Sequence, residues 1–399
     1  MSHRKLPHIG WWLLAIVPVV ALAIVTPPAL RYHHAQRLAA DAESAGGRVY
    51  FERSGPDWLW DLAELLEITE KLTFFETRLT VVDLGDARID DAWLQRIAGE
   101  STIEELDLAG TKITDAGLAS LGPLPKLRTI DISRTSIRGP GLEILRHSTE
   151  LESIDCRYCP LERGALTPLK GLREIWLVDL GKTPVTTDDV RALAGAPSLQ
   201  YLNLDDTAIG PEVLDILRTL PALDSISLQG TPITDEFLIK LLALADWTSL
   251  GLGRTAITDK GLLAMENQVG LFFLDLSETA VTDTGLMVLE HLDDLEGLNL
   301  SRTRISNDSL RSVIQRPHLW FLNLTGTKIT DAGLDLLVSA GPRENSLTIE
   351  IGKTAVTSEA IARALKLQSS WTILRETPEP FADDSDHVDE PFPAFDRDF

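Results

Sequence analysis

Apolar residues recur along most of this chain in one pattern, with a period of 24 residues. Within each copy, leucine-like residues stand eight, five and three positions before a threonine, and another follows two positions after it, as from Leu199 to Ile209. The clearest copy, LDLAGTKITDAGLASL from Leu106 to Leu121, returns nearly unchanged as LNLTGTKITDAGLDLL from Leu322 to Leu337. Self-similarity at a fixed period predicts a solenoid of stacked coils.

The threonine gives the register of the copies, and we call its site in each copy the ladder position. Steps of 24 residues, and a last step of 27, predict twelve repeats. The ladder positions are Ala87, Thr111, Thr135, Cys159, Thr183, Thr207, Thr231, Thr255, Thr279, Thr303, Thr327 and Thr354.

Each copy predicts a strand followed by a helix. In a segment such as Leu106 to Leu108, strand alternation points both leucines into the core and the residue between them outward. In the second half, Thr114 occupies the expected N-cap of a helix, and an aspartate follows in the first turn, where the helix dipole favours it. Leu118 and Leu121 lie one turn apart and close the core.

The spacing LxxLxLxxTxI resembles the leucine-rich repeat family, with threonine where that family usually has asparagine or cysteine. The resemblance implies an α/β horseshoe for residues 77–374, with a parallel sheet on the concave face, helices on the convex face and a buried ladder hydroxyl. The TDxGL half resembles the cysteine-containing subclass of F-box proteins. It also resembles bacterial envelope repeat proteins that carry one N-terminal membrane segment.

Two stretches depart from the pattern. Around Cys159 the helix half lacks the threonine cap and contains Pro168, which predicts a short or irregular helix. Three extra residues in SAGPREN predict a loop insertion before the last copy. We expect a last helix at Ser358 to Leu367 and a last edge strand at Trp371 to Leu374.

The first 30 residues predict a membrane signal-anchor, because residues 9–30 are free of charge and long enough to cross a hydrocarbon core that needs about 20. Basic residues flank both sides, and the short N-terminus favours an orientation with the repeats outside the cytoplasm. The small-x-small run Ala21-Leu22-Ala23 supports an alternative, a cleaved signal and a secreted protein.

Three further segments flank the repeats. Residues 31–47 predict a juxtamembrane spacer helix that ends at its glycine pair. Residues 48–76 predict an N-terminal cap, with a strand at Arg48 to Glu52 and an amphipathic helix at Asp57 to Leu72. Residues 375–399 predict an acidic, disordered tail. The alternative for the tail is a peptide that docks through its phenylalanines, which are Phe381, Phe392, Phe395 and Phe399.

The net charge of −23 argues against a nucleic-acid partner, because such binders carry a basic stripe. It is concentrated in part at the residue between the paired leucines, which is Asp83, Asp107, Asp131, Asp155 and Asp179 in five successive copies. Strands about 4.8 Å apart would align these carboxylates in a column, called here the acidic column, that binds a basic partner or Ca²⁺. The alternative is that aspartate is an ordinary filling of this position, screened by Arg128, Arg134 or Arg157.

Aromatic residues form a second candidate site on the same face. Tyr201, Phe273 and Phe321 stand six positions before the ladder position, and Trp176, Phe272 and Trp320 stand one residue earlier. Exposed aromatic residues in the middle of a sheet are common anchors of protein interfaces. Alternatively, some of them pack against neighbouring strands.

No catalytic or metal constellation is found. Cys156 and Cys159 form CRYC, but they occupy inward and ladder positions of their repeat, and a second ligand pair for zinc is missing. The two GKT triplets lack the earlier glycine of a phosphate loop. We expect no cofactor and no enzyme.

The sequence therefore predicts a membrane-tethered, extracytoplasmic protein that binds another protein, or a cell-surface polymer, on its concave face. Two alternatives stay open, a structural envelope component without a discrete ligand and an F-box-like adaptor.

Overall fold

In the computed structural model the described residues are 32–53, 76–339 and 346–375. They belong to two compact units, unit 1 with residues 1–200 and 219–222, and unit 2 with residues 201–218 and 223–399. The predicted membrane segment, the cap helix at Asp57 to Leu72, most of the loop insertion and the acidic tail after residue 375 lie outside the described residues.

Unit 1 contains a sheet whose first pair is antiparallel and whose other pairs are parallel. Parallel partners such as Glu105 and Thr129 are 24 residues apart, so the sequence period sets the register. The strands are β1 (Arg48–Arg53), β2 (Glu76–Asp83), β3 (Glu105–Asp107), β4 (Thr129–Asp131), β5 (Ser153–Asp155) and β6 (Leu177–Asp179).

Unit 2 continues the same design with parallel pairs only. Phe321 pairs with Thr348, so the three extra residues are absorbed outside the strands. The strands are β7 (Tyr201–Asn203), β8 (Ser225–Ser227), β9 (Ser249–Gly251), β10 (Phe273–Asp275), β11 (Gly297–Asn299), β12 (Phe321–Asn323), β13 (Thr348–Glu350) and β14 (Thr372–Leu374).

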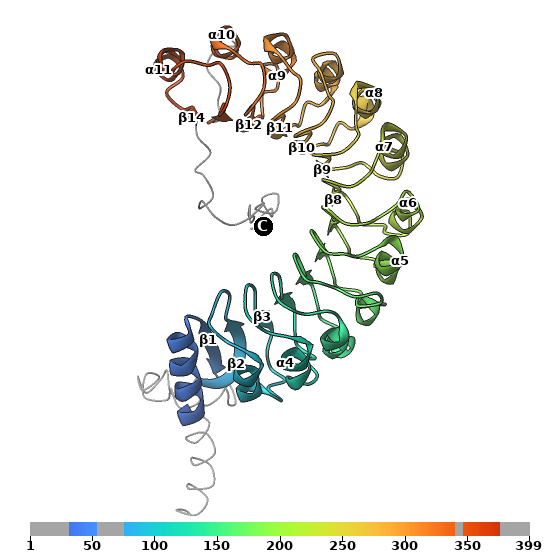
Figure 1. Cartoon of the computed structure of the whole chain (residues 1–399), viewed down its shortest axis with the longest axis vertical. Helices are drawn as coiled ribbons and strands as arrows, with labels where there is room; N and C mark the ends of the chain where they lie inside the picture. Colours follow the sequence, from blue (N-terminus) through green and yellow to red (C-terminus); the bar gives the residue numbers. More distant parts are fainter. Residues whose placement is uncertain (1–31, 54–75, 340–345, 376–399) are drawn as a thin grey trace, which may run out of the picture. The chain divides into compact units, whose positions relative to one another are not determined.

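Short helices lie opposite the strands in each unit (Figure 1). Those of unit 1 are α3 (Asp91–Leu94), η2 (Gln95–Ile97), α4 (Asp115–Ser120), η3 (Pro140–His147), η4 (Thr167–Leu169), α5 (Thr187–Val190) and η5 (Arg191–Leu193). Those of unit 2 are α6 (Val213–Leu217), α7 (Asp235–Leu242), α8 (Asp259–Leu263), η6 (Ala264–Asn267), η7 (Gly285–His291), η8 (Asn307–Ser309), α9 (Leu310–Val313), α10 (Asp331–Ser339) and α11 (Ser358–Leu367).

The core follows the predicted positions. Leu106 and Leu108 are buried while Asp107 between them is half-buried, and Leu118 and Leu121 close the same coil from the helix side. The ladder hydroxyl is also buried as predicted, and the Thr111 hydroxyl donates to the carbonyl of Leu108 at 2.6 Å. The same bond recurs in most coils, so the buried ladder hydroxyl finds an acceptor within its own turn.

The TDxG sequence connects neighbouring coils, which was not predicted. The Asp235 carboxylate accepts the Thr258 backbone N–H at 2.8 Å and the Thr258 hydroxyl at 2.7 Å. A Cβ added to Gly261 would lie 2.4 Å from the same carboxylate, so the glycine leaves the space that the aspartate fills. Equivalent bonds join Asp91 to Thr114 and Asp259 to Thr282.

The residue before the ladder position adopts a left-handed backbone conformation in successive coils, often without being glycine. In unit 2 this row contains Asp206, Gly230 and Arg254. The Arg254 guanidinium makes two hydrogen bonds of 2.9 Å to the Asp206 carboxylate, two coils away, and passes over Gly230. A Cβ on Gly230 would lie 1.9 Å from that carboxylate, so the ion pair requires glycine here, whereas Asp206 and Arg254 adopt the same positive φ with side chains.

Several elements lie where they were predicted, but the helix predicted as a spacer packs against the fold, with Ala35, Leu38 and Ala42 buried. Residues 32–45 are helical up to Gly46, and the Arg88 N–H donates to the carbonyl of Ala45, which ties this helix to the first coil. The element after Cys159 is the three-residue η4, as the missing cap and Pro168 indicated. Helix α11 and strand β14 also lie where the sequence predicted them.

Candidate functional site

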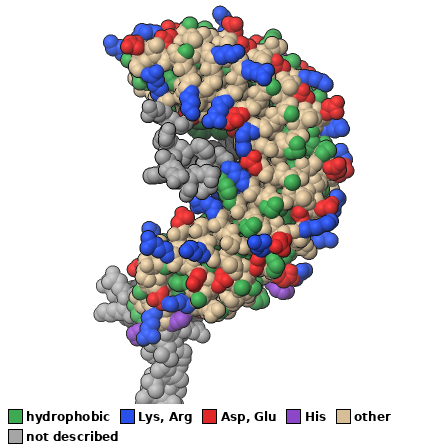
Figure 2. Space-filling model, viewed as in Figure 1, with side chains coloured by type: hydrophobic (Ala, Val, Ile, Leu, Met, Phe, Trp, Pro, Cys, Tyr) green, Lys and Arg blue, Asp and Glu red, His purple; other side chains and the backbone are tan. Residues whose placement is uncertain are grey.

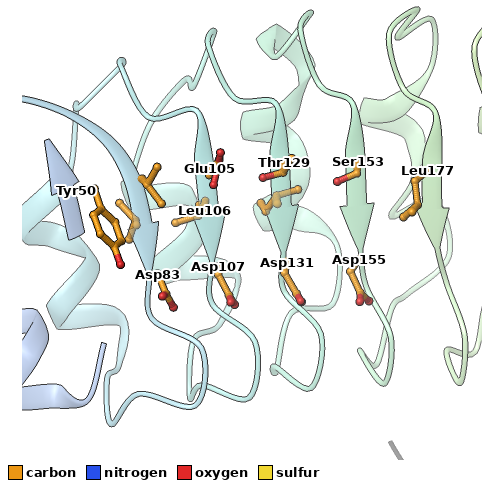
Figure 3. A pocket seen from close by; sticks show the side chains of 13 residues that line it. Tyr50, Asp83, Glu105, Leu106, Asp107, Thr129, Asp131, Ser153, Asp155 and Leu177 are labelled. Carbon is orange, nitrogen blue, oxygen red and sulfur yellow. The ribbon is translucent and has the colours of Figure 1, made fainter. Parts of the chain in front are cut away.

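A groove of about 470 Å³ runs across the strand face of unit 1 (Figure 3). Four residues of the acidic column, Asp83, Asp107, Asp131 and Asp155, project side by side from successive strands along it. A second row contains Glu105, Thr129, Ser153 and Leu177, and Tyr50 stands at the β1 end. The structure therefore brings four of the five predicted aspartates into one groove.

The aspartates also have a structural role that the sequence analysis missed. One carboxylate oxygen of Asp107 accepts the N–H of Ala109 at 2.9 Å, two residues later, and Asp131 holds Ser133 in the same way at 2.8 Å. Asparagine does the same at Asn299 in unit 2. Because this bond uses only one oxygen, the second oxygen of Asp107 or Asp131 can accept a hydrogen bond from a ligand.

An arginine neutralises one end of the column. Arg157 contacts Asp155 at 2.8 Å and Asp179 at 3.5 Å, and Asp179 is only 2% exposed. Asp179 is therefore not part of the groove surface, in contrast to our expectation. The other two arginines considered as screens lie elsewhere, because Arg128 pairs with Glu152 and Arg134 lies 3.7 Å from Asp86.

Electrostatics in the groove favour a cationic ligand. Burial, opposed by a backbone hydrogen bond and reinforced by the charges of Asp131 and Asp83, raises the pKa of Asp107. Burial and Asp131 also raise the pKa of Asp155, although Arg157 works against this rise. A raised carboxyl pKa means that the ionised carboxylate is destabilised here, and a bound positive charge would stabilise it.

The calcium alternative finds no site in the described part of the chain. Among these residues, no group of three or more carboxylate, histidine or cysteine side chains is placed to hold a metal ion. The aspartates stand one per strand, about 4.8 Å apart, and therefore do not converge on one point. A basic group that extends along the row fits this geometry better than a single ion.

Two groove residues escaped the sequence analysis. Glu105 is exposed and adds a carboxylate at the strand position before the leucine pair, where the other copies have uncharged residues. Tyr50 is 47% exposed and comes from β1, whose antiparallel pairing with β2 no repeat pattern could indicate.

The predicted aromatic residues of unit 2 form a cluster, which we call the aromatic cluster and define as Phe273, Trp320 and Phe321. The two phenylalanine rings are stacked with centroids 6.3 Å apart, and the Trp320 ring lies 5.9 Å from Phe321 and 6.4 Å from Phe273. Gly297 separates the two phenylalanines in the sheet, and a Cβ there would lie 2.1 Å from the Phe273 ring. The missing side chain on β11 thus allows the rings of β10 and β12 to meet.

The packing interpretation is confirmed for Phe273, and ligand binding by the aromatic residues stays a prediction. Phe273 is only 8% exposed and packs across its neighbouring strands, whereas Trp320 is 39% exposed and can contact a ligand. Tyr201 lies on β7, three strands from β10, and Phe272 is half-buried. Trp176 precedes β6 in unit 1 and is 36% exposed.

The CRYC cysteines are structural, as predicted. Both thiols are free and buried, and the Cys159 thiol donates to the carbonyl of Ile132 at 2.9 Å. Burial raises the pKa of both thiols, that of Cys159 to about 11. Neither therefore has the thiolate character of a reactive cysteine.

No helix among the described residues combines the length and apolar character that a membrane crossing requires. The apolar segment of residues 9–30 is outside that part of the chain.

Comparisons with known proteins agree with this geometry. A family model described as Leucine Rich repeat matches residues 100–122 and 316–338. No curated protein matches the sequence significantly. Among solved structures, the internalin InlF of Listeria monocytogenes is similar, with 18% identity and a TM-score of 0.52 over 81% of this chain and 95% of that chain.

Two other solved structures are similar at lower scores. A leucine-rich repeat protein of Leptospira interrogans has 16% identity and a TM-score of 0.44 over 75% of this chain and 82% of that one. The plant peptide hormone receptor RGFR1, in complex with RGF2, has 15% identity and a TM-score of 0.42 over 76% of this chain and 57% of that one.

The F-box-like subclass of the TDxGL repeats stays a prediction. The fold itself suggests protein–protein interaction, because such solenoids are typically non-enzymatic binding scaffolds. The regular strand register, the buried ladder and the structural similarity together show that this chain has the α/β solenoid fold of leucine-rich repeats, and two of its stretches match that family's model.

Proposed function

We propose that this protein binds a basic segment of another protein in the acidic groove of unit 1 and is a binding protein rather than an enzyme. The observation that carries the proposal is the row of aspartates Asp83, Asp107 and Asp131, whose outward carboxylate oxygens line one groove. The raised pKa of Asp107 supports it, because a bound cation would favour the ionised form of this carboxylate.

The protein itself contains a template for such binding. The Arg157 side chain reaches along the row and contacts the carboxylates of two successive strands, Asp155 and Asp179. Arginine suits this task because its planar guanidinium can bond two carboxylates at once. We infer that a partner's arginine or lysine side chain occupies the corresponding place between Asp107 and Asp131.

The test measures the anisotropy of a fluorescent hexa-arginine peptide titrated with the full chain. The variant Asp83→Asn, Asp107→Asn and Asp131→Asn removes the charge but keeps an oxygen that can accept the turn hydrogen bond, as Asn299 does. We expect affinity to fall at least ten-fold in this variant.

A charge-matched control separates local recognition from general attraction. Glu212→Gln, Glu236→Gln and Glu266→Gln remove the same number of negative charges at exposed positions on the helix side. Equal losses in the two triple variants would show that only overall charge matters, and would refute the groove as the site.

We also propose that residues 9–30 tether the protein to a membrane with the repeats outside the cytoplasm. The length and charge-free character of this segment support the tether. Fractionation with protease treatment of intact cells tests it, and a protein recovered in the soluble cytoplasm refutes it. Recovery in the medium would favour the cleaved-signal alternative. A structural envelope component would remain the better description if intact-cell crosslinking captured no partner.

A further inference from the structure

The last coils of unit 2 have a strand face unlike that of unit 1. Their strand face carries the aromatic cluster, and the three turns that follow β11, β12 and β13 read SRTR, TGTK and GKTA, without a carboxylate. Arg304, Lys328 and Lys353 in these turns are exposed, as is Arg302, which pairs with Glu278 at 2.7 Å. Figure 2 shows Lys and Arg side chains over this end of the unit, at the top of the view.

The sequence that follows these coils has the complementary composition. Strand β14 ends at Leu374, and residues 376–399 contain nine acidic residues, one arginine and four phenylalanines. The first of the phenylalanines is Phe381, only six residues after Arg375. Acidic charge and aromatic side chains are therefore supplied immediately beside a surface that offers cations and aromatic rings.

We propose that the chain's own segment 376–399 docks on the strand face of unit 2, with a phenylalanine against the aromatic cluster and its carboxylates against the turns SRTR, TGTK and GKTA. This inference concerns a different surface from the acidic groove and does not depend on it. The same segment is repelled by the groove of unit 1, whose lining includes Asp83, Glu105, Asp107 and Asp131.

The dimensions permit this contact within one molecule. Across the sheet, strand β12 lies two strands from β14, or about 10 Å away. Along the strand direction, Phe321 is in register with Thr372, about three residues or roughly 10 Å before Arg375. The diagonal between these points is about 14 Å. Six extended residues span up to about 20 Å, so Phe381 reaches the cluster.

In this arrangement the chain's own segment 376–399 occupies the aromatic cluster. A segment tethered this close to its site has an effective concentration on the order of millimolar, so an external ligand of the cluster must compete with it. The exposed ring of Trp320 is the expected point of contact, because Phe273 is almost fully buried.

The test uses a fluorescent peptide with the sequence of residues 376–399 and a full-length chain whose own four tail phenylalanines are replaced by serine. We expect the peptide to bind this altered chain and to bind the unaltered chain at least ten-fold more weakly, because the unaltered chain's own segment competes. In the altered chain, Trp320→Ala should weaken peptide binding at least ten-fold, and Lys328→Gln with Lys353→Gln should weaken it and reduce its salt dependence.

The control is the double variant Leu263→Ala with Met287→Ala, which removes two exposed apolar side chains on the helix side. Introduced into the altered chain, it should leave peptide binding unchanged. Four outcomes overturn the proposal. The first three are no peptide binding to the altered chain, binding that survives Trp320→Ala, and equal binding by the altered and unaltered chains. The last outcome concerns the molecular mass of the protein in solution, measured by light scattering. If this mass rises with protein concentration and falls when the tail phenylalanines are replaced, the segment docks on a second copy, and docking within one chain is overturned.

Discussion

The contact between Asp235 and the next coil gives a quantitative test of how the repeats hold together. Asp235→Ala removes the acceptor of the Thr258 backbone N–H and of its hydroxyl. A part-buried N–H without a partner costs about 1 to 3 kcal/mol, whereas the hydroxyl can turn to water. We therefore expect the free energy of unfolding to fall by about 2 kcal/mol.

Asparagine at the same position is the matched control. Asn307 already occupies the equivalent site, where its side-chain oxygen accepts the Thr330 N–H at 3.1 Å and its amide donates to the Thr330 hydroxyl at 2.8 Å. Asp235→Asn keeps both contacts and loses only the charge in the first turn of α7, worth about 0.3 to 1 kcal/mol.

Gly261 allows a second test of this contact. A Cβ added to it would lie 2.4 Å from the Asp235 carboxylate and 3.2 Å from the Asp235 Cα. Gly261→Ala should cost about 1 to 3 kcal/mol by overpacking. With Asp235→Ala in place the obstructing oxygen is gone, and alanine recovers up to about 1 kcal/mol of helix propensity. The double variant should therefore be more stable than the sum of the single ones by about 1 to 3 kcal/mol.

Urea unfolding followed by circular dichroism measures the unaltered chain and all four variants, with transition slopes compared to confirm that the same unit unfolds. Equal destabilisation by alanine and asparagine at position 235 would refute the role of the two hydrogen bonds. Additivity of Asp235→Ala and Gly261→Ala within about 0.5 kcal/mol would refute the steric pairing of the two residues.

Three further predictions follow from other contacts. Because the pKa of Asp107 is raised in the folded state, its ionisation opposes folding once the pH exceeds the unfolded value of about 3.9. Asp107→Asn should therefore raise the free energy of unfolding at pH 7 by about a few tenths of a kcal/mol, and urea titrations should show this gain vanish near pH 4. Gly230→Ala should cost more than Gly326→Ala, measured by thermal unfolding, because both need φ near 70° but only the first has an ion pair 1.9 Å from its added Cβ. Cys156 and Cys159 should resist a thiol reagent at pH 8 until the protein is unfolded, and rapid labelling of native protein would contradict their burial.

The repeat period was enough to predict which residues face the core. Leu106, Leu108 and Thr111 follow directly from strand alternation and from the turn, so each is set by its own coil. The bond from Asp235 to Thr258 was missed because it joins residues 23 positions apart, and single-coil reasoning assigns both to helix capping.

The residues of the acidic column and of the aromatic cluster were named from the sequence, but most of their contacts were not predicted. The acidic row was visible, yet nothing in the sequence distinguishes Arg157, which pairs with it, from Arg128, which pairs with Glu152 along the neighbouring coil. The aromatic cluster depends on Gly297, whose significance emerges only when strands are placed side by side.

The ion pair that passes over Gly230 has a consequence for how unit 2 opens. Most contacts in a solenoid link adjacent coils, which allows terminal or single coils to fray almost independently. Because Arg254 holds Asp206 two coils away, the coil between them cannot detach unless this pair also breaks. These three coils should therefore exchange their amide hydrogens as one cooperative block, and this part of the unit should resist proteolytic nicking longer than a chain of nearest-neighbour contacts would.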